Sequence, residues 1–236
     1  IYKICESIMK LNDLKRIIIV CGHYGCGKTN FSLNLALDIA KQGRAVTLID
    51  LDVVNPYFRS SDYQEVLKEN GVDVIAPVYA GTNVDTPALS PKIDTVLDSD
   101  NSSVLIFDVG GDDAGAFALG RYASKIKSEG YSFIYVVNKY RNLISTPELA
   151  LGILGEIMCA CGLEPSCVVN NSHLQNLTTA ETITEALDYG NEVARKLEVP
   201  LLCTTAPNKL MNDKKLENYN LYYVEPIVKP PFGQQA

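Results

Sequence analysis

A glycine-rich stretch that ends in Lys-Thr contains the residue types that bind phosphate groups. Residues 22–29 read Gly-His-Tyr-Gly-Cys-Gly-Lys-Thr and match the spacing G-x-x-x-x-G-K-[ST] in full. Glycines let the backbone approach phosphate oxygens with its N–H groups, Lys28 supplies a positive charge, and the Thr29 hydroxyl suits magnesium. The residues expected to bind phosphate are Gly22, His23, Tyr24, Gly25, Cys26, Gly27, Lys28, Thr29 and Asn30.

Aspartates follow two apolar stretches farther along the chain. Asp50 and Asp52 lie at the end of residues 45–50, and alternation along a strand places both on the same side. Asp108 ends another apolar run, and Gly111 follows it, where its N–H can meet a terminal phosphate. Beside phosphates, such carboxylates hold magnesium or orient an attacking water. The alternative for Asp50 and Asp52 is a turn in which they cap the next segment.

Short apolar runs alternate with stretches of helical spacing and predict the elements that position these residues. Strands are expected at residues 16–21, 45–50, 72–76, 104–108, 133–138, 166–170 and 201–204, and helices at 30–41 and 179–197. Continuous apolar runs are typical of buried parallel strands, and strand–helix alternation implies right-handed crossovers. We expect an α/β fold with a doubly wound, mostly parallel sheet flanked by helices. A strand, this loop and a helix, in that order, predict binding of a nucleoside triphosphate with Mg²⁺.

The pattern of elements suggests one nucleotide-binding domain with an addition at each end. The domain is expected to span residues 15–208, after an N-terminal arm of residues 1–14. Residues 208–220 are polar and charged, and residues 224–232 are rich in proline, which does not fit a central strand or a helix interior. Residues 209–236 are therefore expected to form an extended tail on the surface.

Composition narrows the classes of protein. The 236 residues are 47% hydrophobic and 21% charged, with a net charge of −7, which is typical of a globular protein and disfavours nonspecific DNA binding. The seven cysteines are interpreted as free thiols because they form no metal-binding or disulfide pattern. No apolar run is long enough for a bilayer and no signal-peptide pattern precedes the first strand, so we expect a cytoplasmic protein without a membrane contact.

These motifs together resemble the MinD/ParA/CobB-like class of P-loop ATPases, within the SIMIBI group. The resemblance covers about residues 16–208, and it is strongest to uncharacterised bacterial members with a G-H-Y-G-x-G-K-T loop. Those members also carry D-L-D-x-V-N-P-Y-F-R and D-V-G-G-D-D-A-G, found here at residues 50–59 and 108–115.

The resemblance implies roles for individual residues. Lys28 and Asp52, the expected catalytic residues, match the family's phosphate lysine and water-orienting carboxylate. Thr29 and Asp108 match its Mg²⁺ ligands, and Asp50 is added as a metal ligand from its place at the end of a strand. Gly111 matches the second switch, and Asn171, in preference to Asn170, matches the residue that contacts adenine. Adenine is preferred because residues 138–141 lack the aspartate of the guanine-binding N-K-x-D pattern. The implied cofactors are ATP or ADP and Mg²⁺.

One departure from the family concerns a lysine that many members place early in the loop. That lysine stabilises phosphate charge across a homodimer, and this chain has His23 instead. Homodimerisation and hydrolysis of the family's kind are therefore left open. Other departures are the absence of a basic amphipathic helix, of paired cysteines and of a basic surface, which disfavour membrane, iron–sulfur and DNA roles.

Three functions remain in view. The first is a slow ATPase that acts as a nucleotide-dependent switch and is read by an unknown protein partner. The second is an enzyme that uses ATP to phosphorylate or ligate a small-molecule substrate, as in the CobB/dethiobiotin-synthetase branch. Residues 55–59, Asn-Pro-Tyr-Phe-Arg, favour it because an aromatic pair beside an arginine suits an anionic substrate. The third is an adaptor that binds nucleotide without hydrolysis.

Overall fold

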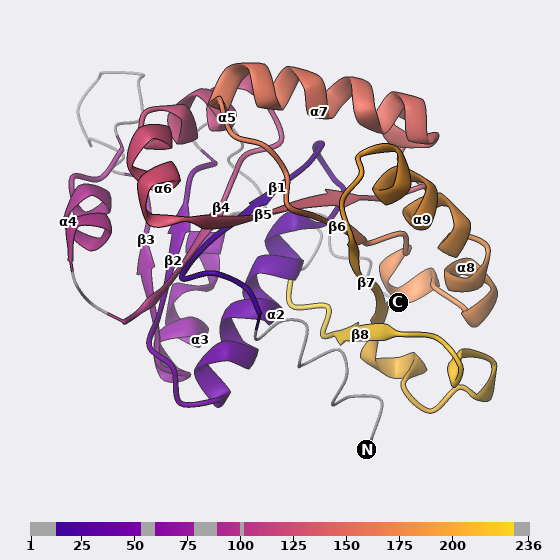
Figure 1. The fold of residues 1–236 in the computed structure, drawn as a ribbon. Helices are drawn as coiled ribbons and strands as arrows, with labels where there is room; N and C mark the ends of the chain where they lie inside the picture. The colour runs from indigo at the N-terminus through magenta and orange to yellow at the C-terminus, as the bar shows by residue number, and fades with distance from the viewer. Residues whose placement is uncertain (1–12, 53–59, 78–88, 100–101, 229–236) are drawn as a thin grey trace, which may run out of the picture.

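The apolar runs of the sequence form parallel strands of one sheet (Figure 1). This computed structural model describes residues 13–52, 60–77, 89–99 and 102–228. Within them the sheet has eight strands in the order β3-β2-β4-β1-β5-β6-β7-β8, each parallel to its neighbours. The strands are β1 (Ile17–Cys21), β2 (Val46–Asp50), β3 (Val72–Ile75), β4 (Val104–Asp108), β5 (Tyr131–Val137), β6 (Cys167–Asn170), β7 (Leu201–Pro207) and β8 (Leu221–Val224). The predicted fold class is confirmed, and all seven predicted strand segments form strands.

Helices cover both faces of the sheet, because parallel neighbours need crossover connections. The helices are α2 (Lys28–Lys41), α3 (Gln64–Glu69), α4 (Lys92–Asp98), α5 (Asp113–Gly120), α6 (Ala123–Glu129), α7 (Pro147–Cys161), α8 (Ala180–Thr184) and α9 (Leu187–Lys196). Short 3-10 helices are η1 (Ser60–Tyr63), η2 (Asn142–Ile144), η3 (Gln175–Leu177), η4 (Asn208–Leu210) and η5 (Lys214–Leu216). In Figure 1, α5, α6 and α7 lie on one side of the sheet, and α2 and α3 lie on the other.

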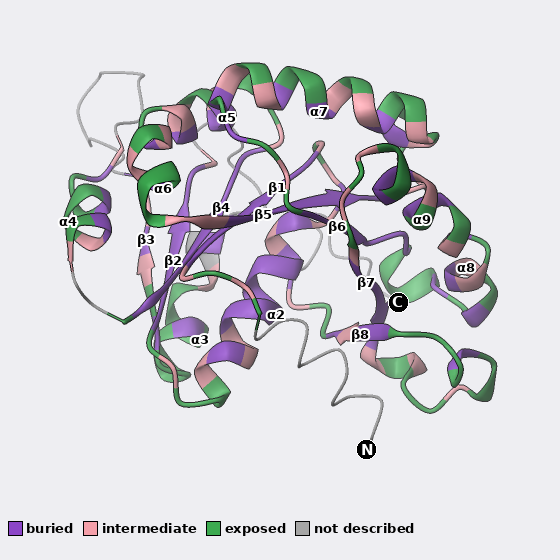
Figure 2. Cartoon of the chain, viewed as in Figure 1, coloured by how far each residue is buried: buried purple, intermediate pink, exposed green. Residues whose placement is uncertain are grey.

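The core lies between these layers. Figure 2 shows the central strands buried, β3 at the edge of the sheet only partly buried, and the helices with both buried and exposed residues. Every residue of β1, β2 and β4 is buried, as expected for strands covered on both faces. This packing holds the carboxyl ends of β1, β2 and β4 at one edge, where open α/β sheets bind ligands.

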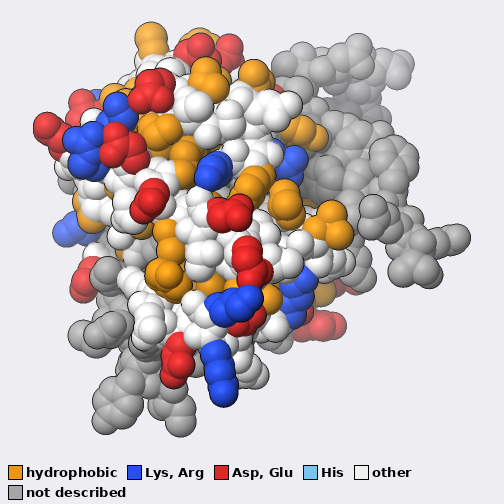
Figure 3. Space-filling model, turned by 90° about the vertical axis from the view of Figure 1, so that its right-hand side faces the viewer, with side chains coloured by type: hydrophobic (Ala, Val, Ile, Leu, Met, Phe, Trp, Pro, Cys, Tyr) orange, Lys and Arg blue, Asp and Glu red, His pale blue; other side chains and the backbone are white. Residues whose placement is uncertain are grey.

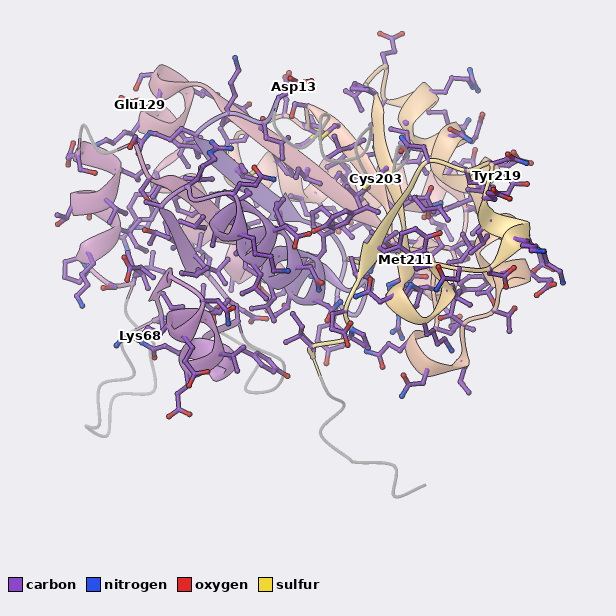
Figure 4. All side chains as sticks on the ribbon, turned by 90° about the horizontal axis from the view of Figure 1, so that it is seen from below. Asp13, Lys68, Glu129, Cys203, Met211 and Tyr219 are labelled. Carbon is purple, nitrogen blue, oxygen red and sulfur yellow. The ribbon has the colours of Figure 1, made fainter. Side chains whose placement is uncertain are left out.

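The sheet extends farther toward the C-terminus than predicted. Residues 209–236 were predicted to form a surface tail, but Leu221–Val224 are the eighth strand and pair with β7 in parallel. Leu221, Tyr222 and Val224 are buried, so apolar burial and the strand hydrogen bonds join this segment to the domain. In Figure 4, Lys68 of α3 lies near one end of the molecule, and Met211 and Tyr219, which precede β8, lie toward the other.

The helix predicted at residues 179–197 is two helices, α8 and α9, with a break at Glu185 and Ala186. The carbonyl oxygens at the break accept hydrogen bonds from side chains. Lys139 Nζ donates to the Glu185 oxygen at 2.7 Å, and Asn170 Nδ2 donates to the Ala186 oxygen at 2.8 Å. A helix that ends here supplies these two carbonyls to the neighbouring loops.

The surface at the β8 end of the sheet is charged but not of one sign. Figure 3 shows acidic and basic side chains interspersed with small groups of hydrophobic ones on this face, so the face lacks the continuous basic area that DNA phosphates require. Among the described residues, no helix has both the length and the apolar character needed to cross a bilayer.

Candidate functional site

The loop of residues 22–29 lies between β1 and α2, as the sequence predicted. Gly27 caps α2 with a φ of 92°. A Cβ at this position would lie 2.2 Å from Nδ2 of Asn171, so only glycine fits both the conformation and the close approach. The helix therefore begins at Lys28, and its first N–H groups face the loop, as a phosphate site requires.

The Lys28 side chain is held inside the loop. Its Nζ donates to the backbone oxygen of His23 at 3.2 Å, and the side chain is largely buried. Gly111, from the segment after β4, lies against it: a Cβ on Gly111 would be 2.9 Å from Lys28 Nζ and 2.6 Å from the backbone N of Tyr24. The structure thus brings the predicted switch glycine into contact with the predicted phosphate loop.

Two buried carboxylates lie side by side at the ends of neighbouring strands. Asp50 of β2 and Asp108 of β4 are register partners, and each is 1% exposed. Ser32 Oγ donates to Asp108 Oδ1 at 3.1 Å, and the Thr29 hydroxyl also bonds this carboxylate. Burial, followed by the charge of Asp50, raises the pKa of Asp108 to about 7, although Lys28 and the two hydroxyls oppose the shift. A carboxylate pair of this kind is stabilised by a cation.

These residues fit a magnesium ion. Thr29, Asp50 and Asp108 offer only oxygen atoms, which are the ligands that Mg²⁺ prefers, and Mg²⁺ bound to few protein groups keeps several waters. No cluster of three or more His, Cys, Asp or Glu side chains occurs in the described residues, so the chain shows no closed metal cage in that part. An open site completed by phosphate oxygens and water matches what is present.

A cavity of about 320 Å³ lies over the phosphate loop. It is lined by Tyr24, Gly25, Gly27, Lys28, Thr29, Asn30, Asp52, Arg141, Gln175 and Val228. Asp52 is partly exposed, and its backbone N–H donates to Asp50 Oδ1 at 2.9 Å. This bond is the turn that the sequence left as an alternative, and it also holds Asp52 beside the lysine and threonine of the loop.

A smaller cavity of about 50 Å³ adjoins the loop on the side of β6, β7 and β8. It is lined by Gly25, Cys26, Gly27, Asn30, Asn138, Arg141, Asn171, His173, Gln175, Pro207, Val224 and Pro226. Prolines, a valine and polar side chains suit a flat heterocycle with hydrogen-bonding edges. A ligand with a phosphate chain and a base can extend from one cavity into the other, because the two share five lining residues: Gly25, Gly27, Asn30, Arg141 and Gln175.

Asn171 and Asn170 have different neighbours. Asn171 Nδ2 donates to the Cys26 oxygen of the loop at 2.7 Å, and its Oδ1 accepts from the Thr205 hydroxyl. The Asn170 amide instead bonds Ala186 and lies inside the sheet and α9 layer. Of the two, Asn171 lines the cavity beside the loop, and its amide also fixes the loop backbone.

The Asn30 side chain has a structural role that the sequence did not suggest. Asn30 Oδ1 accepts from the backbone N–H groups of Ile227 and Val228 at 2.9 and 3.1 Å, and Asn30 Nδ2 donates to the Glu225 oxygen at 3.1 Å. The side chain therefore ties α2 to the segment after β8.

His23 stands where many members of the family have a lysine. Burial and then the charge of Lys28 lower the pKa of His23, so its imidazole is neutral at neutral pH.

Sequence reasoning missed two residues of the site, Arg141 and His173. Arg141 follows β5 and lines both cavities. His173 follows β6, and its Nε2 is a buried polar atom without a hydrogen-bond partner in the described residues. Burial and then the charge of Arg141 lower the pKa of His173 to about 4. The signal that points to both is their position just past the carboxyl ends of strands.

Other predicted features are placed as follows. Asp112, which follows the predicted switch glycine, caps α5, since its side chain accepts from the Gly115 N–H at 3.0 Å. The residues at 55–59 that favoured a small-molecule substrate lie outside the described residues, as do residues 1–12 of the predicted arm. Six cysteines lie in the described residues, and none of them is in a disulfide: Cys21, Cys26, Cys159, Cys161, Cys167 and Cys203.

Comparisons with known proteins agree with this geometry. The CobQ/CobB/MinD/ParA nucleotide-binding domain matches residues 17–199. A curated protein, the light-independent protochlorophyllide reductase iron-sulfur ATP-binding protein of Heliobacterium modesticaldum, is 21% identical over 91% of this chain and 79% of its own length.

Two solved structures share the fold. The signal recognition particle 54 kDa protein of Aeropyrum pernix K1, in complex with GDP, has a TM-score of 0.53 at 14% identity. The match covers 81% of this chain and 41% of that one. The cell division protein FtsY of Thermotoga maritima has a TM-score of 0.52 at 16% identity, over 83% of this chain and 67% of its own.

Proposed function

The chain belongs to the CobQ/CobB/MinD/ParA nucleotide-binding domain family, and from this premise we propose that it binds ATP with Mg²⁺ and hydrolyses it slowly as a nucleotide-dependent switch. The main support for the proposal is that three segments lie close together: the loop with Lys28, the carboxylates at the ends of β2 and β4, and Gly111. The name of the Heliobacterium relative supports ATP as the nucleotide.

The phosphates bind in the larger cavity, over the loop. The N–H groups at the start of α2 and the Lys28 ammonium face this cavity, and both favour negative charge. Lys28 reaches the terminal phosphates while its bond to the His23 oxygen keeps it in place. The nucleotide is held through Gly22, Tyr24, Gly25, Cys26, Gly27, Lys28, Thr29 and Asn30, with His23 contributing its backbone.

Thr29, Asp50 and Asp108 would hold Mg²⁺, and the ion would neutralise phosphate charge there. Ser32 and Thr29 orient the Asp108 carboxylate by hydrogen bonds. Burial raises the pKa of Asp108 to about 7, so its carboxyl group would have to be deprotonated to serve as a magnesium ligand.

Asp52 orients the attacking water. Its carboxylate lies at the cavity with Lys28, and an acceptor there holds a water in line with the terminal phosphorus. The water oxygen bonds to phosphorus, the bond to the bridging oxygen breaks, and ADP, phosphate and a proton result. Lys28 stabilises the charge that develops on the phosphate oxygens.

Gly111 gives the site its switch character. It touches the loop at Tyr24 and Lys28, so loss of the terminal phosphate changes the surroundings of the segment after β4. A protein partner that reads this segment distinguishes the ATP state from the ADP state. Binding of a second copy of the chain is a further arrangement that the family resemblance implies.

The base occupies the smaller cavity, beside Asn171. The Asn171 amide contacts adenine while it holds the Cys26 carbonyl, and Pro207 lies on the same cavity wall. Adenine is preferred over guanine because residues 138–141 lack the aspartate that binds the guanine amino group.

The test is phosphate release by purified protein with ATP or GTP, with and without Mg²⁺. We expect slow release that needs Mg²⁺, prefers ATP and is lost in Asp52→Asn. Release only after addition of a small-molecule acceptor would instead support the kinase or ligase alternative. Nucleotide binding with no release in any condition would support the adaptor.

A further inference from the structure

The Arg141 guanidinium lies directly over the phosphate loop. A Cβ built on Gly25 would be 3.5 Å from Cζ and from Nε of Arg141, and 3.8 Å from its Nη1. The side chain lines the cavity with Lys28 and Thr29 and also the cavity with Asn171. Arg141 therefore lies where the two cavities meet. It follows β5, on one side of β1 in the sheet, whereas Asp50 and Asp108 end β2 and β4, on the other side of β1.

The backbone that carries Arg141 is fixed to the protein. Its N–H donates to the Asn138 oxygen at 3.1 Å, and its own oxygen accepts from the Ile144 N–H at 3.0 Å. The preceding residues are tied to the next loop, since the Lys139 N–H donates to Ser172 Oγ at 2.8 Å and the Tyr140 hydroxyl donates to the Thr182 oxygen at 2.6 Å. Only the side chain of Arg141 needs to move to meet a ligand.

Arg141 forms no ion pair with another residue in the part of the chain that the structure describes. Its neighbour Lys139 donates its ammonium to the Glu185 carbonyl, away from the loop. The basic residues in ion pairs there are Arg16, Lys41, Lys125, Arg195, Lys196 and Lys215. Arg141 is exposed, so its guanidinium is available to an anion.

We propose that Arg141 binds the phosphate chain of the nucleotide as a second cation beside Lys28. A guanidinium is planar, stays charged and presents paired N–H donors that match phosphate oxygens. Because it comes from the loop after β5 of the same chain, the site obtains this cation without a partner subunit. This inference rests on the proposed nucleotide binding.

A competing role for Arg141 is stacking on the base, since it also lines the smaller cavity and guanidinium planes stack on aromatic rings. The two roles differ in the part of the ligand that they need. A phosphate contact acts on inorganic tripolyphosphate as strongly as on ATP, whereas stacking acts on ATP alone.

The experiment measures the affinity of Arg141→Gln, Arg141→Lys and wild type for ATP, and for tripolyphosphate in competition with ATP, all with Mg²⁺. Lys139→Gln is the matched control, because it removes a cation from the same loop that faces away from the site. We expect Arg141→Gln to lose roughly 10- to 100-fold for both ligands, Arg141→Lys to recover part of the loss, and Lys139→Gln to bind like wild type.

Equal affinity of Arg141→Gln and wild type for both ligands would overturn the inference and leave the proposed function intact. A loss for ATP with no loss for tripolyphosphate would overturn it in favour of base stacking. Failure of the wild type to bind either ligand would overturn the inference and the proposed function together. Thermal unfolding of each variant checks that the fold is retained, as expected for an exposed side chain.

Discussion

Replacing Asn30 by alanine removes the side chain that ties α2 to the segment after β8. Asn30 accepts hydrogen bonds from the N–H groups of Ile227 and Val228 and donates one to the Glu225 oxygen. Two of these groups keep another partner, because the Glu225 oxygen still accepts from Asn34 Nδ2 at 2.9 Å and the Ile227 N–H still donates to the Glu225 oxygen at 2.9 Å. The N–H of the buried Val228 loses its acceptor.

The loss of stability in Asn30→Ala can be worked out from the one buried N–H group that loses its acceptor. A buried donor left without a partner costs about 1–3 kcal/mol, and alanine returns up to about 0.7 kcal/mol because it favours the helix more than asparagine does. We therefore expect Asn30→Ala to lower the free energy of unfolding by about 1–2 kcal/mol. Residues 225–228 can also detach locally, so the backbone amides of Glu225, Ile227 and Val228 should exchange hydrogen roughly 5- to 30-fold faster.

The assay combines urea unfolding with hydrogen exchange in the absence of nucleotide. Asn191→Ala is the matched control: Asn191 is also an asparagine on a helix, but it is exposed and bonds only within α9, to the Leu187 oxygen at 3.1 Å. This control should raise the free energy of unfolding by at most about 0.7 kcal/mol, through the same preference of alanine for the helix, and should leave exchange near β8 unchanged. Unchanged exchange at residues 225–228 in Asn30→Ala, or a loss above about 4 kcal/mol, would refute this account of the contact.

Three further predictions follow from the site. Gly27→Ala should lower ATP affinity at least roughly tenfold, because its Cβ would lie 2.2 Å from Asn171 Nδ2; titration with a fluorescent nucleotide measures this, and wild-type affinity would contradict it. Burial, with the Arg141 charge second, lowers the pKa of His173 from 6.5 to about 4, so the unfolded chain takes up the proton first as the pH falls. The stability that neutral His173 contributes is therefore fully present above pH 6.5 and lost by pH 4, and it amounts to about 3 kcal/mol at 1.36 kcal/mol per pKa unit. Unfolding curves measured across this pH range should show the loss in the wild type and not in His173→Gln. The same pH dependence in both proteins would contradict the prediction. Asp108→Asn should abolish the gain in ATP affinity that Mg²⁺ gives. Asp113 is an exposed aspartate nearby, and Asp113→Asn should keep this gain; calorimetry with and without Mg²⁺ measures the ATP affinity of both variants.

The strands around the site could be predicted because their chemistry is local. Residues such as Ile17–Cys21 and Val104–Asp108 are continuous apolar runs, and burial on both faces of a sheet requires such runs. The loop could be predicted because its glycines and Lys-Thr have a fixed spacing, and because an apolar run precedes them and a stretch of helical spacing follows them.

The elements that could not be predicted depend on contacts between distant segments. Leu221–Val224 is a four-residue strand between a polar stretch and prolines, and its place beside β7 comes from pairing and burial that no local pattern records. The break between α8 and α9 likewise depends on Lys139 and Asn170, which take the carbonyls of the break from other loops.

The cavity walls were missed for the same reason. Arg141 and His173 reach the loop because β5 lies beside β1 and β6 lies beside β5, and strand order is a property of the assembled sheet. Asn30 was predicted from its position after the loop, but its side chain bonds the segment after β8.

Calorimetric titration of the wild type and of Lys28→Ala with Mg-ATP measures whether the loop binds the phosphates of ATP with Mg²⁺. We expect the wild type to bind at one site per chain, and the variant, which lacks the ammonium, to bind roughly 10-fold more weakly or worse. Equal affinity of the two proteins, or no binding by the wild type, would contradict this expectation.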